Sequence, residues 1–292
     1  MIRIMPSVYR IKDFAVHGGT AINLFHKNMP RYSVDIDLTY IPVKERAESL
    51  DAINNHLRTL KSYIEKSIPG IKVIHKHDVW KLQCTLDGAT VKIEVNGTKR
   101  GIIGETEDRK LCERAETEFN MTCKARTVSY SQLYGGKIAA ALSRQHPRDL
   151  FDCKYMEMAS FHDVKNGFML CLLGSDKPVI ESLQPNAIDQ TEALENQFEG
   201  MSDTPFTYPD YEEARHKLIR QVNDSMTETD REFLLSFENG EPDWEKCCAG
   251  DLSRYPSVKW KLQNIAKLKK SNPQKHKAGL EKLQTFLFPK KG

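Results

Sequence analysis

The 292-residue chain lacks the features that mark membrane proteins, zinc-binding modules and disulfide-rich proteins. Its longest apolar run, Phe168 to Leu173, is far shorter than the roughly 20 residues that a membrane-spanning helix needs. The N-terminus has no long apolar stretch followed by a small-residue cleavage site, so we expect a cytoplasmic protein that does not contact membranes. The seven cysteines form no C-x-x-C pair and no cysteine-histidine cluster at zinc-ligand spacing. We therefore expect reduced, mostly buried thiols.

Acidic residues are almost absent from the C-terminal end of the chain. From Arg254 to Gly292 there are eleven Lys or Arg residues against one acid, Glu281, which gives a net charge of +10. Because the whole chain carries +3, residues 1–253 carry 3 − 10 = −7. A basic segment of this kind favours a polyanionic partner such as RNA, and a solvated surface tail is the alternative interpretation.

The first part of the chain has the sequence pattern of an α/β domain. Residues 33–39 alternate between polar and apolar side chains, as a half-buried strand requires, and residues 91–96 do the same. Asp87-Gly88 separates the second of these runs from a preceding strand-like run, which predicts a β-hairpin. We predict an α/β (α+β) domain over residues 1–165 with a mixed, partly antiparallel sheet.

The second part of the chain is predicted to be helical. Residues 174–210 carry eight acids against one lysine together with four prolines, which indicates a connector with short helical pieces. Residues 212–222 and 229–237 show helical spacing, with Thr227 or Thr229 as the N-cap of the second helix. We predict a C-terminal helical bundle domain over residues 166–292 that ends in the basic tail.

Three carboxylates are candidate metal ligands. If residues 33–39 form one strand, Asp35 and Asp37 share one face of it, because alternate side chains of a strand point the same way. Glu94 lies on the polar side of the second strand of the hairpin, and it supplies a third carboxylate if that strand neighbours the first. Carboxylates on a rigid frame suit Mg²⁺ in phosphoryl-group chemistry.

A glycine turn precedes these carboxylates. Gly18, Gly19 and Thr20 follow an apolar segment and open a helix-like run. Glycines let a phosphate approach the backbone amides, a helix N-terminus adds positive potential, and the threonine hydroxyl is a further donor. A plain tight turn is the alternative interpretation.

A third cluster combines cations and acids. Lys137 and Arg144 are seven residues apart in a predicted helix, so they share a face that suits a triphosphate. Pro147 is typical of the first turn of a following helix, which begins with Arg148 and Asp149 and carries Asp152 one turn later. The alternative is a surface salt-bridge network around Arg144, Arg148, Asp149 and Asp152.

Taken together, these motifs resemble the AbiEii/AbiGii toxin family of nucleotidyltransferases. The matching segments are Gly18 to Ala21, Arg31 to Leu38, Lys92 to Asn96, Lys137 to Arg144 and Arg148 to Asp152. The resemblance continues through Glu199 to Met201, Arg231 to Leu234 and Tyr255 to Leu262, so it covers most of the chain. The glycine and Asp-x-Asp motifs are shared by a wider superfamily, and the Lys and Arg-Asp motifs make the resemblance more specific.

The resemblance implies a polymerase-β-like nucleotidyltransferase domain joined to a helical domain, acting as the toxin of a type IV toxin-antitoxin pair whose antitoxin is encoded nearby. It implies that the Gly18-Gly19-Thr20 turn holds nucleotide phosphates and that Asp35 and Asp37 bind metal. It further implies that Lys137 contacts the triphosphate and that Asp149 is the later catalytic acid. Arg148 and Asp152 match neighbouring motif positions.

The predicted reaction is transfer of a nucleotide from an NTP to an RNA 3′ end, such as that of a tRNA, with Mg²⁺ or Mn²⁺ as cofactor. One alternative is a small-molecule nucleotidyltransferase of the aminoglycoside-modifying kind, which resembles the chain only from the glycines to the aspartates. Another is a non-catalytic regulator that binds NTP. Trp80 and Trp244 are expected in the core, whereas Trp260 is a candidate base-stacking residue because Lys259, Lys261, Lys267, Lys269 and Lys270 surround it.

Overall fold

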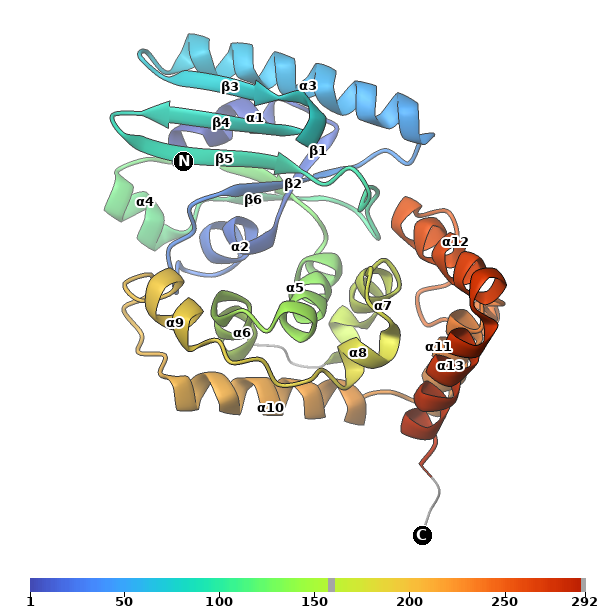
Figure 1. Ribbon diagram of the computed structural model, residues 1–292. Helices are drawn as coiled ribbons and strands as arrows, with labels where there is room; N and C mark the ends of the chain where they lie inside the picture. Colours follow the sequence, from blue (N-terminus) through green and yellow to red (C-terminus); the bar gives the residue numbers. More distant parts are fainter. Residues whose placement is uncertain (157–160, 290–292) are drawn as a thin grey trace. The chain divides into compact units, whose positions relative to one another are not determined.

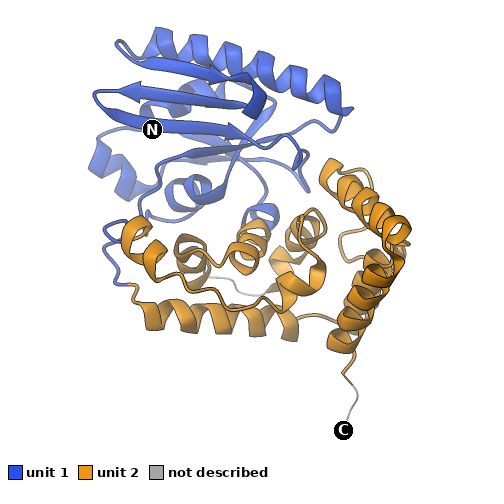
Figure 2. Cartoon of the chain, viewed as in Figure 1, with its two compact units in different colours: residues 1–133, 199–205 blue, residues 134–198, 206–292 orange. Residues whose placement is uncertain are grey.

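A computed structural model describes residues 1–156 and 161–289 of the chain. The chain forms two compact units, of which the first comprises Met1–Leu133 with Glu199–Pro205 and the second Tyr134–Phe198 with Phe206–Gly292 (Figure 2). These units are defined by packing, and the predicted folding domains 1–165 and 166–292 stay a prediction. Lys290 and Lys291, the last lysines of the basic segment, lie outside the described residues.

The first unit is built on a seven-stranded sheet with the order β3-β4-β5-β2-β1-β7-β6 (Figure 1). Its strands are β1 (Phe14–His17), β2 (Ile36–Tyr40), β3 (Lys72–Lys76), β4 (Lys81–Leu86), β5 (Ala89–Val95), β6 (Glu107–Lys110) and β7 (Lys124–Thr127). β2 pairs parallel with β5 and antiparallel with β1, and β1 pairs parallel with β7. The prediction of a mixed sheet is confirmed.

The predicted hairpin is also confirmed. β4 and β5 pair antiparallel up to Leu86 and Ala89, so that Asp87 and Gly88 alone connect them. Both connecting residues have positive φ, at 50° and 80°, which is the backbone of the turn that joins right-twisted strands most readily.

Helices cover the sheet of the first unit. These helices are α1 (Met5–Tyr9), α2 (Gly18–Ala21), α3 (Arg46–Ser67) and α4 (Glu113–Phe119), and a π-helical turn, η2 (Ile22–His26), extends α2. α3 packs on β3 and β4 and contacts α1 (Figure 1). Its fully buried residues Ile53, Leu57, Leu60 and Ile64 recur at helical spacing, so one apolar stripe attaches the helix to the core.

The second unit is helical, as predicted. After α5 (Tyr130–Arg144), which begins in the first unit, it contains α6 (Pro147–Lys154), α7 (Lys165–Leu173), α8 (Val179–Leu183), α9 (Thr191–Gln197), α10 (Tyr208–Asp224), α11 (Glu228–Glu238), α12 (Pro256–Ser271) and α13 (Pro273–Leu287). The core includes Phe151, whose ring packs against Phe198 and Phe206 at centroid distances of 5.0 and 5.4 Å. Thr227 caps α11 and Thr229 lies inside the helix, which settles the two predicted caps in favour of Thr227. Within the described residues, no helix combines the length and apolar character that a bilayer crossing requires.

Candidate active site

Asp37 and Glu94 lie on neighbouring strands of the first unit. The parallel register of β2 and β5 places Asp37 directly opposite Glu94, so the two strands are neighbours, which was the condition for Glu94 to supply a third carboxylate. Ile36 and Leu38 are buried on either side of the exposed Asp37. Glu94 Oε1 lies 2.5 Å from Lys81 Nζ of β4, and its side chain is 40% exposed. The charge of Glu94 is therefore balanced by a lysine from the adjacent strand.

Gly18 contacts the carboxylate of Asp37. A Cβ atom at position 18 would lie 2.4 Å from Asp37 Oδ2, and the backbone of Gly18 has φ +70°, which L side chains rarely adopt. Both observations require glycine at this position. The carboxylate of Asp37 thus lies against the backbone where β1 ends and α2 begins.

Asp35 is placed differently from the prediction. β2 begins at Ile36, so Asp35 lies in the extended segment before the strand, and Val34 is 49% exposed instead of packed in the core. The strand starts late because β1 ends at His17, opposite Asp37, and Gly18 then turns the chain into a helix. β1 therefore offers residues 33–35 no antiparallel partner. The Asp35 carboxylate instead accepts a hydrogen bond of 3.2 Å from the backbone N–H of Lys92.

Thr20 fastens the segment that carries Asp35. Its hydroxyl is buried and donates to the backbone carbonyl of Asp35, and it lies 2.9 Å from the Ser33 hydroxyl. Since a hydroxyl has one hydrogen, the group left for a phosphate is the backbone N–H of Thr20. The predicted contact of Thr20 with nucleotide phosphates stays a prediction.

Arg31 is a buried cation beside the glycine turn. The residue is 4% exposed, and a Cβ atom at position 19 would lie 2.7 Å from its Nη2 atom. The loop that carries Arg31 is hydrogen-bonded to the segment Glu199–Pro205, which is distant in sequence. The backbone N–H of Tyr32 donates to the carbonyl of Met201 at 2.7 Å. A guanidinium next to Gly19 adds positive potential where an anion approaches the turn.

The carboxylates of this unit suit a divalent metal that phosphate oxygens help to hold. Within the described residues, no three His, Cys, Asp or Glu side chains form a complete ligand group. Mg²⁺ commonly uses one or two carboxylates together with substrate phosphates, so a complete protein cage is not required. Asp35 and Asp37 provide two carboxylates, and the absence of a side chain at Gly18 lets the Asp37 carboxylate lie directly against the backbone. Glu94 is opposite Asp37 but is paired with Lys81.

In the second unit, Lys137 is buried between two acids. Its Nζ atom lies 2.8 Å from Asp149 Oδ1 and 3.0 Å from Asp152 Oδ2, and the side chains of the three residues are at most 7% exposed. Arg144 binds the second oxygen of Asp149 at 2.7 Å while its own side chain stays 64% exposed. Lys137 and Arg144 therefore share a helix face, as predicted. Burial alone would raise the pKa of Asp149, but the charges of Lys137 and Arg144 lower it to about 2.

The turn between α5 and α6 brings Arg144 and Asp149 together. Gln145 has φ 53°, His146 caps α6 through a 3.1 Å bond from the Arg148 backbone N–H, and Pro147 occupies the first turn as predicted. Arg148 makes no ion pair with a described residue. The alternative interpretation, a surface salt-bridge network, is therefore met only in part, because the network is largely buried and contains Lys137 in place of Arg148.

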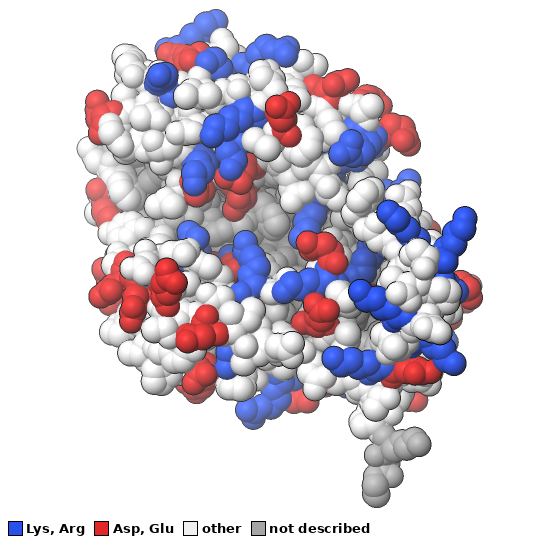
Figure 3. All heavy atoms as spheres, viewed as in Figure 1, with Lys and Arg blue, Asp and Glu red and all other residues white. Residues whose placement is uncertain are grey.

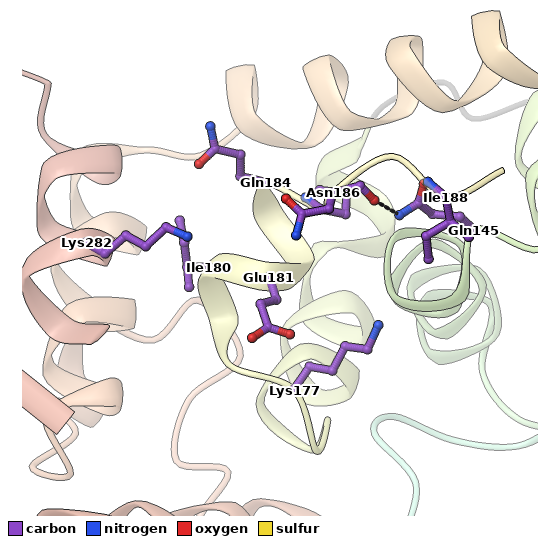
Figure 4. Close-up of a pocket in the computed structure, with 9 residues that line it drawn as sticks. Gln145, Lys177, Ile180, Glu181, Gln184, Asn186, Ile188 and Lys282 are labelled. Carbon is purple, nitrogen blue, oxygen red and sulfur yellow. Dashed lines mark hydrogen bonds between the residues drawn. The ribbon is translucent and has the colours of Figure 1, made fainter. Parts of the chain in front are cut away.

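The side chain of Gln145 fixes this turn through hydrogen bonds to a distant backbone segment. Its amide nitrogen donates to the Asn186 carbonyl at 2.6 Å, and its amide oxygen accepts from the Ile188 backbone N–H at 3.4 Å (Figure 4). The residue is 1% exposed and forms one wall of a cavity of about 260 Å³ that Lys177 and Glu181 also line. The geometry of the Arg144–Asp149 pair thus depends on a residue that the sequence patterns did not single out.

The chain is similar to known proteins both in structure and in sequence family. Among solved structures, it is similar to MenT4, a nucleotidyltransferase toxin from Mycobacterium tuberculosis H37Rv, with 13% identity, a TM-score of 0.57 and 90% of each chain covered. It is also similar to JHP933 from Helicobacter pylori, with 16% identity over 75% of this chain and 86% of that chain, at a TM-score of 0.42. At these identities the first likeness shows the fold alone, and the second carries no argument.

No curated protein sequence matches the chain. A family profile does match, over residues 10–264, and its family is described as nucleotidyl transferase AbiEii toxin, type IV TA system. The match spans most of the chain, including the glycine turn, the two aspartates and the Lys137 cluster. Membership implies an NTP substrate, a divalent metal and a cognate antitoxin. The chain therefore belongs to the AbiEii family and is a nucleotidyltransferase toxin of a type IV toxin-antitoxin system.

Proposed function

We propose that the protein transfers a nucleoside monophosphate from an NTP to the 3′ end of an RNA, such as a tRNA. The observation that carries this proposal is the contact between Gly18 and the Asp37 carboxylate, which brings the acid that we propose to bind metal next to the glycine turn that we propose to bind phosphates. RNA is favoured as acceptor because residues 254–292 carry a net charge of +10.

In this proposal, Asp35 and Asp37 hold Mg²⁺ or Mn²⁺, and the backbone amides of Gly18, Gly19 and Thr20 bind the phosphates. When bound, the metal neutralises the triphosphate and activates the attacking hydroxyl. The acceptor hydroxyl loses its proton to water and forms a bond to the α-phosphorus, the bond from that phosphorus to the bridging oxygen breaks, and pyrophosphate leaves.

The cations of the Lys137 cluster are a further part of the proposal. We propose that Lys137, Arg144 and Arg148 stabilise triphosphate charge. Asp149, which the family resemblance assigns as the later catalytic acid, binds both Lys137 and Arg144, and in this scheme it also positions these two cations. Glu94 is assigned a supporting role in metal binding, for which Lys81 must release it.

The acceptor proposal has consequences for the cell. Modification of a tRNA 3′ end would halt translation, which takes place in the cytoplasm. We propose that the cognate antitoxin is encoded beside the toxin.

The test is label transfer from each α-³²P-labelled NTP to total bacterial RNA in the presence of Mg²⁺. One NTP is expected to label one RNA band, and prior periodate oxidation of the RNA 3′ end is expected to abolish the label. Asp35→Ala is expected to abolish transfer, whereas Asp51→Asn, which removes an exposed carboxylate from α3, is expected to leave it unchanged. Absence of label with every NTP, or label that survives oxidation, would contradict transfer to an RNA 3′ end.

A further inference from the structure

Trp260 is exposed on the outer face of α12. Its exposed fraction is 55%, although tryptophan is mostly buried in folded proteins. The opposite face of the helix is attached to the second unit through the buried residues Val258 and Ile265. α12 therefore already buries its apolar stripe, and Trp260 is a single large aromatic side chain left outside that stripe.

The lysines of α12 divide into two groups. Lys261 is 6% exposed and donates to the carbonyls of Ser175, at 3.2 Å, and Lys177, so it belongs to the interior. This corrects the expectation that Lys261 surrounds Trp260 on the surface. Lys269 is bound to Glu241 at 3.0 Å and to the Asn239 carbonyl. These two lysines have local structural partners.

The remaining lysines accompany Trp260. Lys259, Lys267 and Lys270 are exposed and make no ion pair with any residue that the structure describes. Trp260, Gln263, Lys267 and Lys270 recur at i, i+3, i+7 and i+10, so they follow one stripe of the helix. Along the stripe the side chains present, in order, an aromatic ring, an amide and two ammonium groups.

The neighbouring helix increases the positive potential. α13 packs against α12 and carries the exposed Lys275, Lys277 and Lys282, with Glu281 as its single acid. Lys and Arg side chains accordingly predominate over the C-terminal helices in Figure 3. An anionic chain lying along α12 therefore meets almost no charge of its own sign on these two helices.

We propose that the outer face of α12, defined by Lys259, Trp260, Gln263, Lys267 and Lys270, binds single-stranded RNA. Trp260 stacks on one base, and the three lysines contact phosphates, which is the combination that proteins use to hold single strands without reading their sequence. A membrane surface fits less well, because interfacial helices need a wide exposed apolar face and α12 exposes one ring. The inference rests on the proposed function, since it assigns a surface to the RNA acceptor.

The test measures RNA binding separately from catalysis. Full-length Asp37→Asn protein is titrated into a fluorescein-labelled 12-nucleotide single-stranded RNA, and anisotropy gives Kd at several KCl concentrations. Adding Trp260→Ala is expected to weaken binding roughly 5- to 100-fold, as the loss of one stacked base predicts, and Trp260→Phe is expected to restore much of the affinity. The melting temperature should not change, because the side chain is exposed.

Replacing Lys259, Lys267 and Lys270 by alanine is expected to reduce the slope of log Kd against log salt by about 2, which is roughly 0.7 for each lost phosphate contact. Lys269→Ala is the matched control and should leave the slope unchanged, because that lysine is bound to Glu241. Unchanged Kd in the Trp260→Ala protein, an unchanged slope in the triple variant, or equal competition by polyglutamate at the same charge would each overturn the inference.

The outcomes separate this inference from the proposed function. Trp260-dependent RNA binding without label transfer would support the surface and contradict the transferase proposal. Label transfer by a Trp260→Ala protein with unchanged KM for RNA would support the transferase and contradict the surface.

Discussion

Replacing Gly18 by alanine should disable transfer while the protein stays folded. The added Cβ atom would lie 2.4 Å from Asp37 Oδ2, and an ordinary contact begins at 3.4 Å, so the carboxylate must move by at least 3.4 − 2.4 = 1.0 Å. A misplacement of about 1 Å at a reacting centre costs on the order of 100-fold in rate. We expect transfer by Gly18→Ala to fall by about that factor.

Gly88→Ala separates this effect from backbone strain. Gly88 also has positive φ, +80°, but an added Cβ atom would meet nothing within 4 Å. Both variants pay roughly 1–2 kcal/mol for an L residue in the left-handed region, equivalent to a fall in Tm of about 2–8 °C. Thermal melts and single-turnover label transfer are measured on both proteins and on the wild type.

The expected pattern is two similar losses of Tm and one loss of transfer. If Gly18→Ala transfers nucleotide within a few-fold of the wild-type rate, the contact between Gly18 and Asp37 has no role in catalysis. If Gly88→Ala loses transfer to the same extent, backbone strain in the first unit explains both results.

Two further predictions concern buried ionisable groups. Lys137→Met leaves the carboxylates of Asp149 and Asp152 buried without that cation. We therefore expect the free energy of unfolding at pH 7, measured by urea titration, to fall by about 3–5 kcal/mol, and we expect this loss to shrink as falling pH protonates the acids. An unchanged urea midpoint would contradict this prediction. The pKa of His26 is lowered to about 4 by burial and by Arg109, so wild-type stability should fall between about pH 6.5 and pH 4, where the unfolded chain binds the additional proton. His26→Gln should flatten that part of the Tm–pH profile, and an equal slope in both proteins would refute the assignment.

Local patterns were sufficient to predict much of the fold. The Asp87-Gly88 hairpin, the Pro147 helix start and the mixed sheet depend on turn chemistry and on the period of apolar residues, and both are properties of short segments. The same holds for the shared face of Lys137 and Arg144, which follows from helical spacing.

Features that depend on neighbouring strands were not predictable in this way. Alternation extended the strand back to Ser33, but the length of β2 is set by where β1 ends, and that depends on Gly18. The contact of Gly18 with Asp37 depends on strand register and on a positive φ, which a Gly-Gly sequence permits without requiring it.

Other site features depend on residues distant in sequence. Gln145 is fixed by Asn186 and Ile188, and the loop before Asp35 is fixed by Met201. Burial of Lys137 with two carboxylates also requires the packing of α5 against α6. No pattern of charge or hydropathy along the chain encodes these contacts, although Arg31 did fall within a matched motif.

The central claim is that the Asp37 carboxylate takes part in nucleotide transfer to RNA. Single-turnover transfer of α-³²P from the accepted NTP to RNA by wild-type and Asp37→Asn proteins, at equal RNA occupancy and with Mg²⁺ in excess, tests it most directly. We predict that Asn at this position, which keeps the shape and removes the charge, abolishes label in the RNA while the melting temperature stays within a few degrees of the wild type. Transfer by Asp37→Asn at the wild-type rate would contradict the account.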